Sequence, residues 1–583
     1  MKATELGRAL KACRLHFALA ALFSAGINLL YLAPPLFMMQ VYDRVLNSGS
    51  EATLFYLILA LFIALATLAV LDDVRAQALT RAGVRLDQRL AARVLSSLID
   101  LGLSRRTPPR AQALRDLETL RQFVSSQGTH ALFDAPWMPI YLLVLTLIHS
   151  WMGLFALAGT VVIVCLAAAN EYATRVALLL GNEQSIRNHA AAEATLRNGE
   201  VIQAMGMQRG LMRRWRQNRA MALGLQIVAY DRNSFYSSLI KLLRLFLQSL
   251  MLGLGAWLAI ERQISPGAMF AASILFGRAM APVEQMIGAW RQFVGVREAY
   301  GRLGDLLRAV PPNPERMQLP DPEGALSLTR LIFAPQSADR AVIKGIDLSI
   351  GRGEAVGIIG PSAAGKSTLA RLMVGVWRPS AGVVRLDDAD VSQWDREQLG
   401  RHIGYLPQDV ELFSGTVSDN IARFQETRAD AVVQAANRAG IHDLILRLPD
   451  GYDTEIGEGG AILSAGQRQR IGLARALFGN PRLVVLDEPN SNLDIEGEQA
   501  LTRAVSQLKA DAATVIVITH RPSILVAVDR IIGLRDGTVE MDGPRGEILA
   551  RIFPPPGRPA QAQSPTIVEP SKWSETRRPV EQA

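Results

Sequence analysis

The sequence is poor in cysteine and has no internal repeat. Its 583 residues include only Cys13 and Cys165, so a disulfide framework is excluded and both side chains are expected to be packing residues. The residues after Phe553 have too little apolar content to form a core, which predicts a disordered tail over 553–583. The first long apolar run lacks a small-residue cleavage site before Pro34, so it is not a removable signal peptide.

What the sequence does contain is apolar residues, which make up 49% of the chain and crowd into its first half. Six runs are long enough, and poor enough in charge, to cross a bilayer. They are His16–Gln40, Leu54–Leu71, Pro136–His149, Met152–Ala168, Leu239–Ile260 and Ala268–Trp290. The alternative, buried helices of a large soluble protein, fits the short third run but not six runs with a consistent charge asymmetry between their connections.

The connections between the runs differ in length and charge. Those between the second and third runs, and between the fourth and fifth, are long and rich in arginine, while the other three are short. The positive-inside tendency therefore places both long connections and the basic N-terminus in the cytoplasm. We expect them to prolong the helices below the bilayer and to end in transverse turns near Pro108–Leu114 and Met205–Arg213. These arginines also explain the net charge of +8, so we do not predict nucleic-acid binding.

A few charged residues lie inside the apolar runs, where charge is unfavourable and suggests function. Lys241 and Arg244 lie at the cytoplasmic end of the fifth run, where their side chains can reach the interface. Arg278 lies about 18 Å into the last run by helical rise. We expect it to face a hydrated pathway or a carboxylate such as Glu284.

The second half of the chain contains a phosphate-binding loop. A glycine-rich segment follows the apolar, strand-like run Ala355–Ile359 and precedes a helix-like run. It consists of Gly360, Pro361, Ser362, Ala363, Ala364, Gly365, Lys366, Ser367 and Thr368. In such a strand, loop and helix, backbone N–H groups surround a phosphate, the lysine reaches the terminal phosphates and the following hydroxyl ligates Mg²⁺. The segment therefore predicts binding of a nucleoside triphosphate with Mg²⁺.

A phosphate-binding loop alone is compatible with kinases, GTPases and helicases. The buried strand Leu483–Asp487 ends in two carboxylates, which suits Asp487 as an Mg²⁺ ligand and Glu488 as the base beside an attacking water. Between these motifs lies Leu463-Ser464-Ala-Gly466-Gln467. This run resembles the signature of the ATP-binding-cassette (ABC) superfamily, with Ala465 at its third position.

The remaining motifs follow in the order of that family. Gln408 matches its Q-loop, Ser491-Asn-Leu-Asp494 its D-loop, His520 its switch histidine, and Ile456–Gly460 the loop that contacts the membrane domain in exporters. The resemblance implies an ATP site shared by two subunits. It makes Glu488, His520 and Gln408 catalytic, Ser367, Gln408 and Asp487 metal-binding, and Ser464, Gly466, Gln467 and Asp494 nucleotide-binding together with the whole phosphate-binding loop.

One position departs from the family pattern. Many cassettes stack adenine on an aromatic residue ahead of the phosphate-binding loop, where this chain reads Phe333-Ala-Pro-Gln336. Either Phe333 serves this purpose or adenine is held loosely. ATP remains the expected nucleotide.

The membrane half resembles the inner-membrane ABC subunits of type I secretion systems, in the class that exports metalloproteases, lipases and haem-binding proteins. The segments that carry this resemblance are Gln40–Ser50, Asp116–Phe123, Phe133–Tyr141 and Asn198–Met207. It implies a homodimer in the bacterial inner membrane that passes unfolded proteins with C-terminal signals to a membrane-fusion adaptor and an outer-membrane channel. Some relatives carry a peptidase domain before the first span, and none is expected here because that span begins near His16.

The predicted fold is multi-domain: an all-α transmembrane domain with six spans, of the type I ABC exporter fold, and an α/β P-loop ABC nucleotide-binding domain. We predict the transmembrane domain over 1–305, a Pro-rich linker over 306–324, the nucleotide-binding domain over 325–552 and the tail over 553–583. An ABC exporter of lipids, drugs or peptides is the alternative function. The six spans argue against a third class, the soluble cassette ATPases of regulation or nucleic-acid repair.

Overall fold

The computed structural model describes residues 5–105, 112–312, 316, 318–335 and 340–552. The chain divides into two compact units, Met1–Pro312 and Asn313–Ala583, and the division falls inside the predicted linker. The last helix of the first unit continues to Ala309, beyond the predicted end of the transmembrane domain at 305. The predicted tail lies outside the described residues. Each unit is described separately below.

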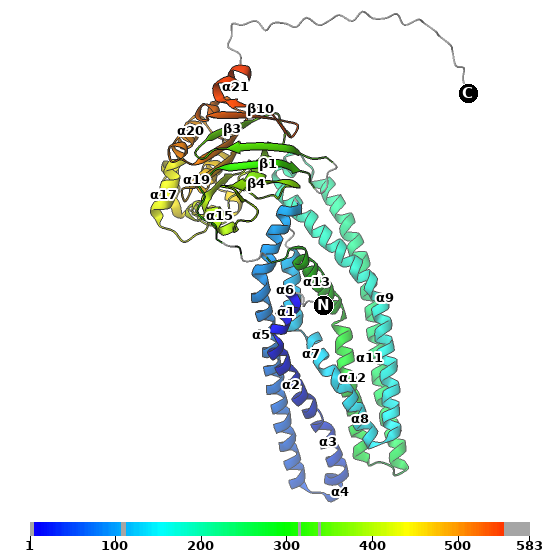
Figure 1. Ribbon diagram of the computed structural model, residues 1–583. Coiled ribbons are helices and arrows are strands. Elements are labelled where there is room, and N and C mark those ends of the chain that lie inside the picture. The colour runs from blue at the N-terminus through cyan, green and yellow to red at the C-terminus, as the bar shows by residue number, and fades with distance from the viewer. Residues whose placement is uncertain (1–4, 106–111, 313–315, 317, 336–339, 553–583) are drawn as a thin grey trace, which may run out of the picture. The chain divides into compact units, whose positions relative to one another are not determined.

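The described part of the first unit is helical (Figure 1). Its helices are α1 (Glu5–Ala12), α2 (Arg14–Leu30), α3 (Ala33–Gln40), the π-helical turn η1 (Val41–Val45), α4 (Leu46–Ser48), α5 (Glu51–Arg105), α6 (Gln112–Val124), α7 (Gln127–Asp134), the 3₁₀ turn η2 (Ala135–Trp137), α8 (Met138–Ile148), α9 (Ser150–Arg197), α10 (Gly199–Ala204), α11 (Gln208–Ile260), α12 (Pro266–Gly288) and α13 (Trp290–Ala309).

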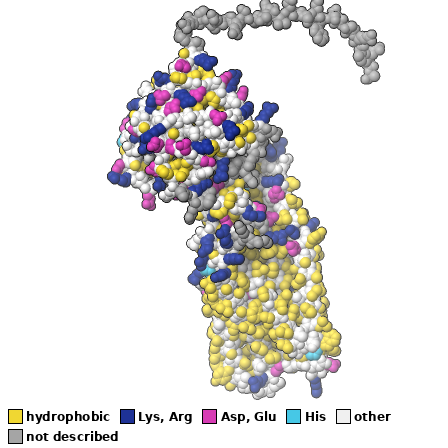
Figure 2. Space-filling model, in the orientation of Figure 1, with side chains coloured by type: hydrophobic (Ala, Val, Ile, Leu, Met, Phe, Trp, Pro, Cys, Tyr) yellow, Lys and Arg dark blue, Asp and Glu magenta, His cyan; other side chains and the backbone are white. Residues whose placement is uncertain are grey.

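Within the described residues, six helical segments are long and apolar enough to cross a membrane, which confirms the number predicted from the sequence. They are Arg14–Ser48, Glu51–Gly102, Gln127–Ile148, Ser150–Arg197, Gln208–Ile260 and Pro266–Gly288. On the face drawn in Figure 2, hydrophobic side chains cover most of this unit. Helix α5 has 55 residues and is about 80 Å long by helical rise, so it extends well beyond a hydrocarbon core of about 30 Å.

The first span is interrupted next to its two prolines. Helix α2 ends at Leu30 and α3 begins at Ala33, with Pro34 in the first turn, where a missing N–H is tolerated. Consecutive prolines account for the interruption, because neither can donate a backbone N–H to the preceding turn. The two cysteines are free. Cys13 is buried, which fits the packing role expected of both, whereas Cys165 is exposed and does not fit it.

The structure agrees only in part with the predicted transverse turns. Residues 106–111 lie outside the described residues, so most of the first turn does too. The second prediction, Met205–Arg213, is placed too late in the sequence: the short helix is α10, Gly199–Ala204, and the long helix α11 has already begun at Gln208. Gly206, with φ of 64°, allows the chain to reverse between them.

The charged residues of the spans pair differently from the prediction. Arg244 on α11 forms an ion pair with Glu284 on α12, with 3.0 Å between Nε and Oε2, so Glu284 is the partner of Arg244 and not of Arg278. Which arginine pairs with Glu284 depends on which faces of α11 and α12 meet. The spacing of charges along the sequence does not show which faces these are.

The second unit is an α/β domain with two sheets. Its strands are β1 (Leu326–Phe333), β2 (Ile343–Ile350), β3 (Ala355–Ile359), β4 (Ala381–Leu386), β5 (Ala389–Asp390), β6 (Ile403–Leu406), β7 (Leu483–Asp487), β8 (Thr514–Ile518), β9 (Arg530–Arg535) and β10 (Thr538–Pro544). Its α-helices are α14 (Lys366–Met373), α15 (Arg396–His402), α16 (Val417–Ile421), α17 (Ala429–Arg438), α18 (His442–Ile445), α19 (Ala465–Leu477), α20 (Ile495–Ala510) and α21 (Arg545–Ile552).

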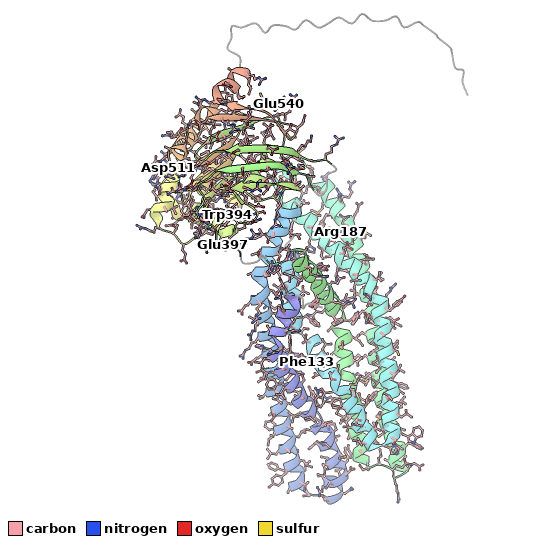
Figure 3. The ribbon with its side chains drawn as sticks, in the orientation of Figure 1. Phe133, Arg187, Trp394, Glu397, Asp511 and Glu540 are labelled. Atoms are coloured by element: carbon pink, nitrogen blue, oxygen red, sulfur yellow. The ribbon has the colours of Figure 1, made fainter. Side chains whose placement is uncertain are left out.

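The larger sheet has the order β10-β9-β3-β8-β7-β6 and is parallel except for β10. Strands β7 and β8 are buried along their whole length, which explains why they read as continuous apolar runs. The smaller, antiparallel sheet has the order β2-β1-β4-β5. Trp394, a fully buried side chain, belongs to the core that includes residues of both sheets (Figure 3).

Candidate nucleotide site

The site residues are gathered by the parallel sheet. Strands β3, β8, β7 and β6 are neighbours in that order, and their carboxyl ends lie along one edge. Each strand is followed within two residues by a predicted site residue: Gly360 after β3, His520 after β8, Glu488 after β7 and Gln408 after β6. Ligands of open α/β sheets bind at this edge, which agrees with the prediction.

The phosphate-binding loop has the backbone that an anion cradle requires. Gly360, with φ of 153°, approaches the opposing strand so closely that an added Cβ would lie 2.2 Å from the carbonyl oxygen of Leu534. Gly365 has φ of 97° and directly precedes α14, so the N–H groups of this helix face the loop. The Lys366 ammonium donates to the carbonyl oxygens of Gly360 and Pro361, at 2.8 and 2.9 Å. Lys366 thus folds across the loop, where a phosphate can reach it.

Asp487 fits the predicted Mg²⁺ site. Its side chain is 1% exposed, and neither carboxylate oxygen has a hydrogen-bond partner among the described residues. Burial raises the pKa of this carboxyl group, whereas the nearby Ser367 hydroxyl acts in the opposite direction. Two buried oxygens without partners are unfavourable unless a cation binds them, and a carboxylate with a hydroxyl is a donor set that Mg²⁺ accepts.

The three predicted catalytic side chains meet. Glu488 accepts a hydrogen bond from the Gln408 amide, with 3.2 Å from Nε2 to Oε2. Its other oxygen, Oε1, lies 3.4 Å from Nδ1 of His520. Glu488 has φ of 49°, which is rare for a residue with a side chain and indicates a constrained backbone at this position. A carboxylate between an amide and an imidazole can accept a proton from a water molecule bound beside it.

The signature residues form a helix cap. Ser464 is the N-cap of α19: its hydroxyl accepts from the N–H of Gln467 at 3.2 Å, and the Gln467 side chain accepts from the N–H of Ser464 at 2.8 Å. At Gly466 an added Cβ would lie 2.9 Å from the carbonyl oxygen of Asn492. Within the described part of this chain, no hydrogen bond or ion pair joins these signature residues to the phosphate-binding loop. Their predicted contact with nucleotide therefore stays a prediction.

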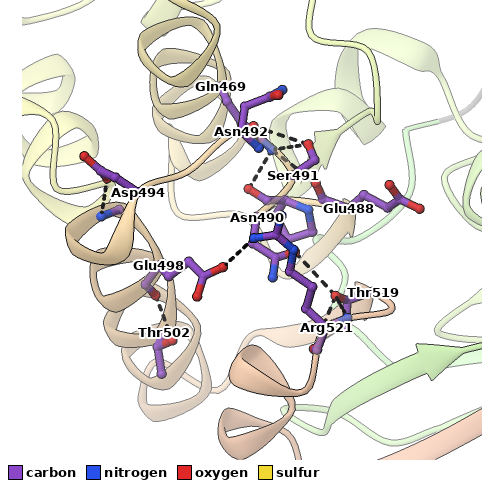
Figure 4. A network of polar contacts seen from close by, with 12 residues as sticks. Gln469, Glu488, Asn490, Ser491, Asn492, Asp494, Glu498, Thr502, Thr519 and Arg521 are labelled. Atoms are coloured by element: carbon purple, nitrogen blue, oxygen red, sulfur yellow. Dashed lines mark hydrogen bonds and ion pairs between the residues drawn. The ribbon is translucent and has the colours of Figure 1, made fainter.

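Sequence reasoning missed Gln469, which connects the signature helix to the catalytic strand (Figure 4). Its side chain is 2% exposed. The amide nitrogen donates to the carbonyl oxygens of Glu488 and Pro489, at 3.1 and 2.6 Å, and the amide oxygen accepts from the N–H of Asn492 at 3.0 Å. Position 469 follows the signature directly, but nothing in its neighbours along the sequence marks it as buried.

Two further residues hold the surrounding loops. Asp494 is the N-cap of α20 and accepts from the N–H of Gly497 at 2.8 Å, so its observed role is local and its nucleotide contact stays a prediction. After β8, the buried Thr519 hydroxyl accepts from the N–H of Arg521, whose side chain pairs with Glu498 at 2.9 Å (Figure 4). These contacts fix the loop that carries His520.

The suggested adenine-stacking role of Phe333 is wrong. The side chain is 9% exposed and stacks on Trp377, with 5.4 Å between ring centroids and 9° between planes. Successive side chains of β1 point to opposite faces of the sheet, and position 333 is on the buried face. The ring therefore belongs to the core of the unit. Gln336, the last residue of that segment, lies outside the described residues.

Fold and site together define a membrane-spanning ABC ATPase. The chain matches the ABC transporter family over residues 343–491 and the ABC transporter transmembrane region over residues 17–283. It belongs to the ABC transporter family, among the type I secretion system ATP-binding proteins, and it is a nucleotide-binding, multi-pass membrane protein.

Individual relatives support this assignment. The chain is 43% identical to the type I secretion system ATP-binding protein PrsD of Rhizobium meliloti, over 95% of this chain and 96% of that protein. It is 31% identical to the cyclolysin secretion/processing ATP-binding protein CyaB of Bordetella pertussis, over 91% of this chain and 75% of that protein. Among solved structures, a bacterial Atm1-family ABC exporter with ATP bound superposes with a TM-score of 0.77 at 24% identity, covering 92% of this chain and 96% of that chain, which shows a shared fold.

Proposed function

We propose that this protein is the homodimeric, ATP-hydrolysing subunit of a type I secretion system that moves unfolded proteins with C-terminal signals out of the cytoplasm. The observation that carries the proposal is the 43% identity to a type I secretion protein over nearly the whole of both chains, membrane half included. The cassette motifs occur in ABC proteins of many functions, whereas similarity across the spans is evidence about what is transported. A membrane-fusion adaptor and an outer-membrane channel are the proposed partners.

The proposed ATP site is shared between two copies of the chain. One copy supplies the phosphate-binding loop with Lys366, and Ser464 of the second copy closes over the terminal phosphate. The N-terminus of α19 supports this arrangement, because the positive end of a helix attracts an anion and the Ser464 hydroxyl, which accepts from the N–H of Gln467, can still donate its own proton to a phosphate. Glu488 then takes a proton from the attacking water, while His520 and Gln408 hold its carboxylate in place.

Mg²⁺ is the proposed metal, held by Asp487, Ser367 and Gln408. When bound, it would neutralise charge on the phosphates during hydrolysis. The buried, unpartnered oxygens of Asp487 support this assignment most directly. Gln408 also donates to Glu488 at 3.2 Å, so this side chain would connect the metal site with the base.

The proposed location is the bacterial inner membrane, with the nucleotide-binding unit in the cytoplasm. Arginine-rich segments between the second and third spans and between the fourth and fifth support this orientation. It places the cassette where ATP is available.

The experiment that tests this function is reconstitution of the full chain in lipid, with ATP hydrolysis measured against two panels of compounds. One panel contains C-terminal segments of candidate secreted proteins, and the other contains lipids, drugs and short amphiphilic peptides. We expect saturable stimulation by at least one C-terminal segment and not by its scrambled version. Stimulation by the second panel alone would contradict the proposal and favour a lipid, drug or peptide exporter.

A further inference from the structure

Arg278 is a charged residue of α12, which is the most buried of the six spans. It lies twelve positions after Pro266, the first residue of α12, which puts it about 18 Å along the helix by its rise of 1.5 Å per residue. Half of the apolar window of α12 is buried, against at most 33% in the other five spans. The guanidinium is therefore well away from both ends of the span, and lipid headgroups are not within its reach.

The guanidinium of Arg278 is held by an aromatic face. Its central carbon lies 4.0 Å from the centroid of the Tyr31 ring, at the end of α2. Stacking on a ring uses the face of the guanidinium and leaves the N–H groups at its edge available. Among the described residues, no ion pair or hydrogen bond to Arg278 is formed. Tyr31 thus fixes the position of the charge without satisfying its donors.

The carboxylates near this position are already used by other cations. Glu284, the only acidic residue of α12, pairs with Arg244. Asp134 accepts from Arg75 at 2.8 Å and from the amide of Asn28, also at 2.8 Å. These pairs lie within the same unit, yet none includes Arg278. A cation at this depth requires an anionic or strongly polar partner, and no described residue of this chain forms an ion pair or hydrogen bond with it.

We propose that Arg278, supported by Tyr31, binds carboxylate side chains of the unfolded polypeptide as it passes through the membrane domain. This proposal rests on the proposed function, protein export. A guanidinium presents a planar fork that matches a carboxylate with two parallel hydrogen bonds. An unfolded chain can bring its Asp and Glu side chains into the membrane domain. A folded protein carries the same residues but is too large to enter. Arg278 is only half-buried, so each contact is screened and weak, and the moving chain is released readily.

The test uses the reconstituted full chain and two versions of one synthetic unstructured polypeptide, both ending in a C-terminal segment that stimulates ATP hydrolysis. One version carries Asp and Glu at intervals, and the other carries Asn and Gln at the same positions. The measurement is the polypeptide concentration that gives half-maximal stimulation. We expect wild type to respond to the acidic version at about a fivefold lower concentration, the upper range for a partly hydrated ion pair.

Substitutions then assign the preference to Arg278. Arg278→Gln should lose the preference by weakening the response to the acidic version alone. Arg278→Lys, which keeps the charge but not the fork, should retain part of it and serves as the second variant if the first does not fold. Lys241→Gln is the matched control, because Lys241 is an exposed cation of α11 without an ion pair in the described structure, and it should keep the full preference.

The possible results distinguish a failure of carboxylate binding at Arg278 from a failure of the proposed export function. If wild type responds to both versions at the same concentration, or if both Arg278 variants keep the full preference, carboxylate binding at Arg278 is wrong while protein export stands. If no C-terminal segment stimulates wild type in the first place, the export function itself is contradicted, and this proposal fails with it.

Discussion

Gln469→Leu should destabilise the nucleotide-binding unit and slow hydrolysis together. The substitution removes the hydrogen bonds of a side chain that is 2% exposed. Leucine leaves the carbonyl of the buried Pro489 without its bond, whereas the N–H of the exposed Asn492 can turn to water and the Glu488 carbonyl keeps a bond from Ser491. At about 1–3 kcal/mol for an orphaned buried group, the free energy of unfolding should fall by about 2 kcal/mol.

The assay is the apparent thermal midpoint of the unit that contains Gln469, measured in the full purified chain. A loss of about 2 kcal/mol should lower the midpoint by about 4–8 °C for a domain of this size. Hydrolysis should fall about tenfold or more, because Gln469 positions the backbone of Glu488. Gln499→Leu, the same change at an exposed position of α20, is the control. A midpoint and rate equal to those of the control would refute this reasoning.

Three further predictions concern the same site. Glu488→Gln should retain ATP binding but reduce hydrolysis by about 10²–10⁴-fold, the usual contribution of a general base, in a single-turnover assay. Gly360→Ala should abolish ATP binding, measured by fluorescence of a nucleotide analogue, because the added Cβ would lie 2.2 Å from the Leu534 carbonyl oxygen. Chelation of Mg²⁺ by EDTA should stop hydrolysis, and Asp487→Asn should raise the Mg²⁺ concentration needed to restore it.

Each of these has a result that contradicts it. Near-wild-type turnover in Glu488→Gln would exclude that carboxylate as the base. Unchanged nucleotide affinity in Gly360→Ala would mean that the loop relaxes away from β9, and Gly253→Ala, an open position in a span, is its control. An unaltered Mg²⁺ dependence in Asp487→Asn would remove Asp487 as a ligand.

The sequence predicted those parts of the site that lie in local motifs. Glu488 was recognisable by the apolar strand before it, and Gln408 and His520 by their match to the family's motifs. Because the strands that precede these residues are neighbours in a parallel arrangement, their carboxyl ends meet. The number of spans was likewise predictable, since crossing a bilayer requires a minimum apolar length that can be read from the chain.

The failures involve contacts between distant segments. The pairing of Arg244 with Glu284, 40 positions apart in sequence, depends on which faces of α11 and α12 meet. Phe333 was suggested as an adenine platform because of its place before the phosphate-binding loop, but the position of Trp377 beneath it decides its role. Gln469 was missed because its partners lie about 20 residues further on, in a loop whose path follows from the sheet.

The central claim is that each ATP site combines Lys366 of one copy with Ser464 of another. It is tested most directly by ATP hydrolysis in two purified mixed dimers. In the first, one copy carries Lys366→Ala and the other Ser464→Arg; in the second, wild type is paired with a copy carrying both changes. A shared site leaves one intact site in the first dimer and none in the second, so we predict hydrolysis in the first alone. Hydrolysis in the second alone would show that both residues act within one chain and would contradict the account.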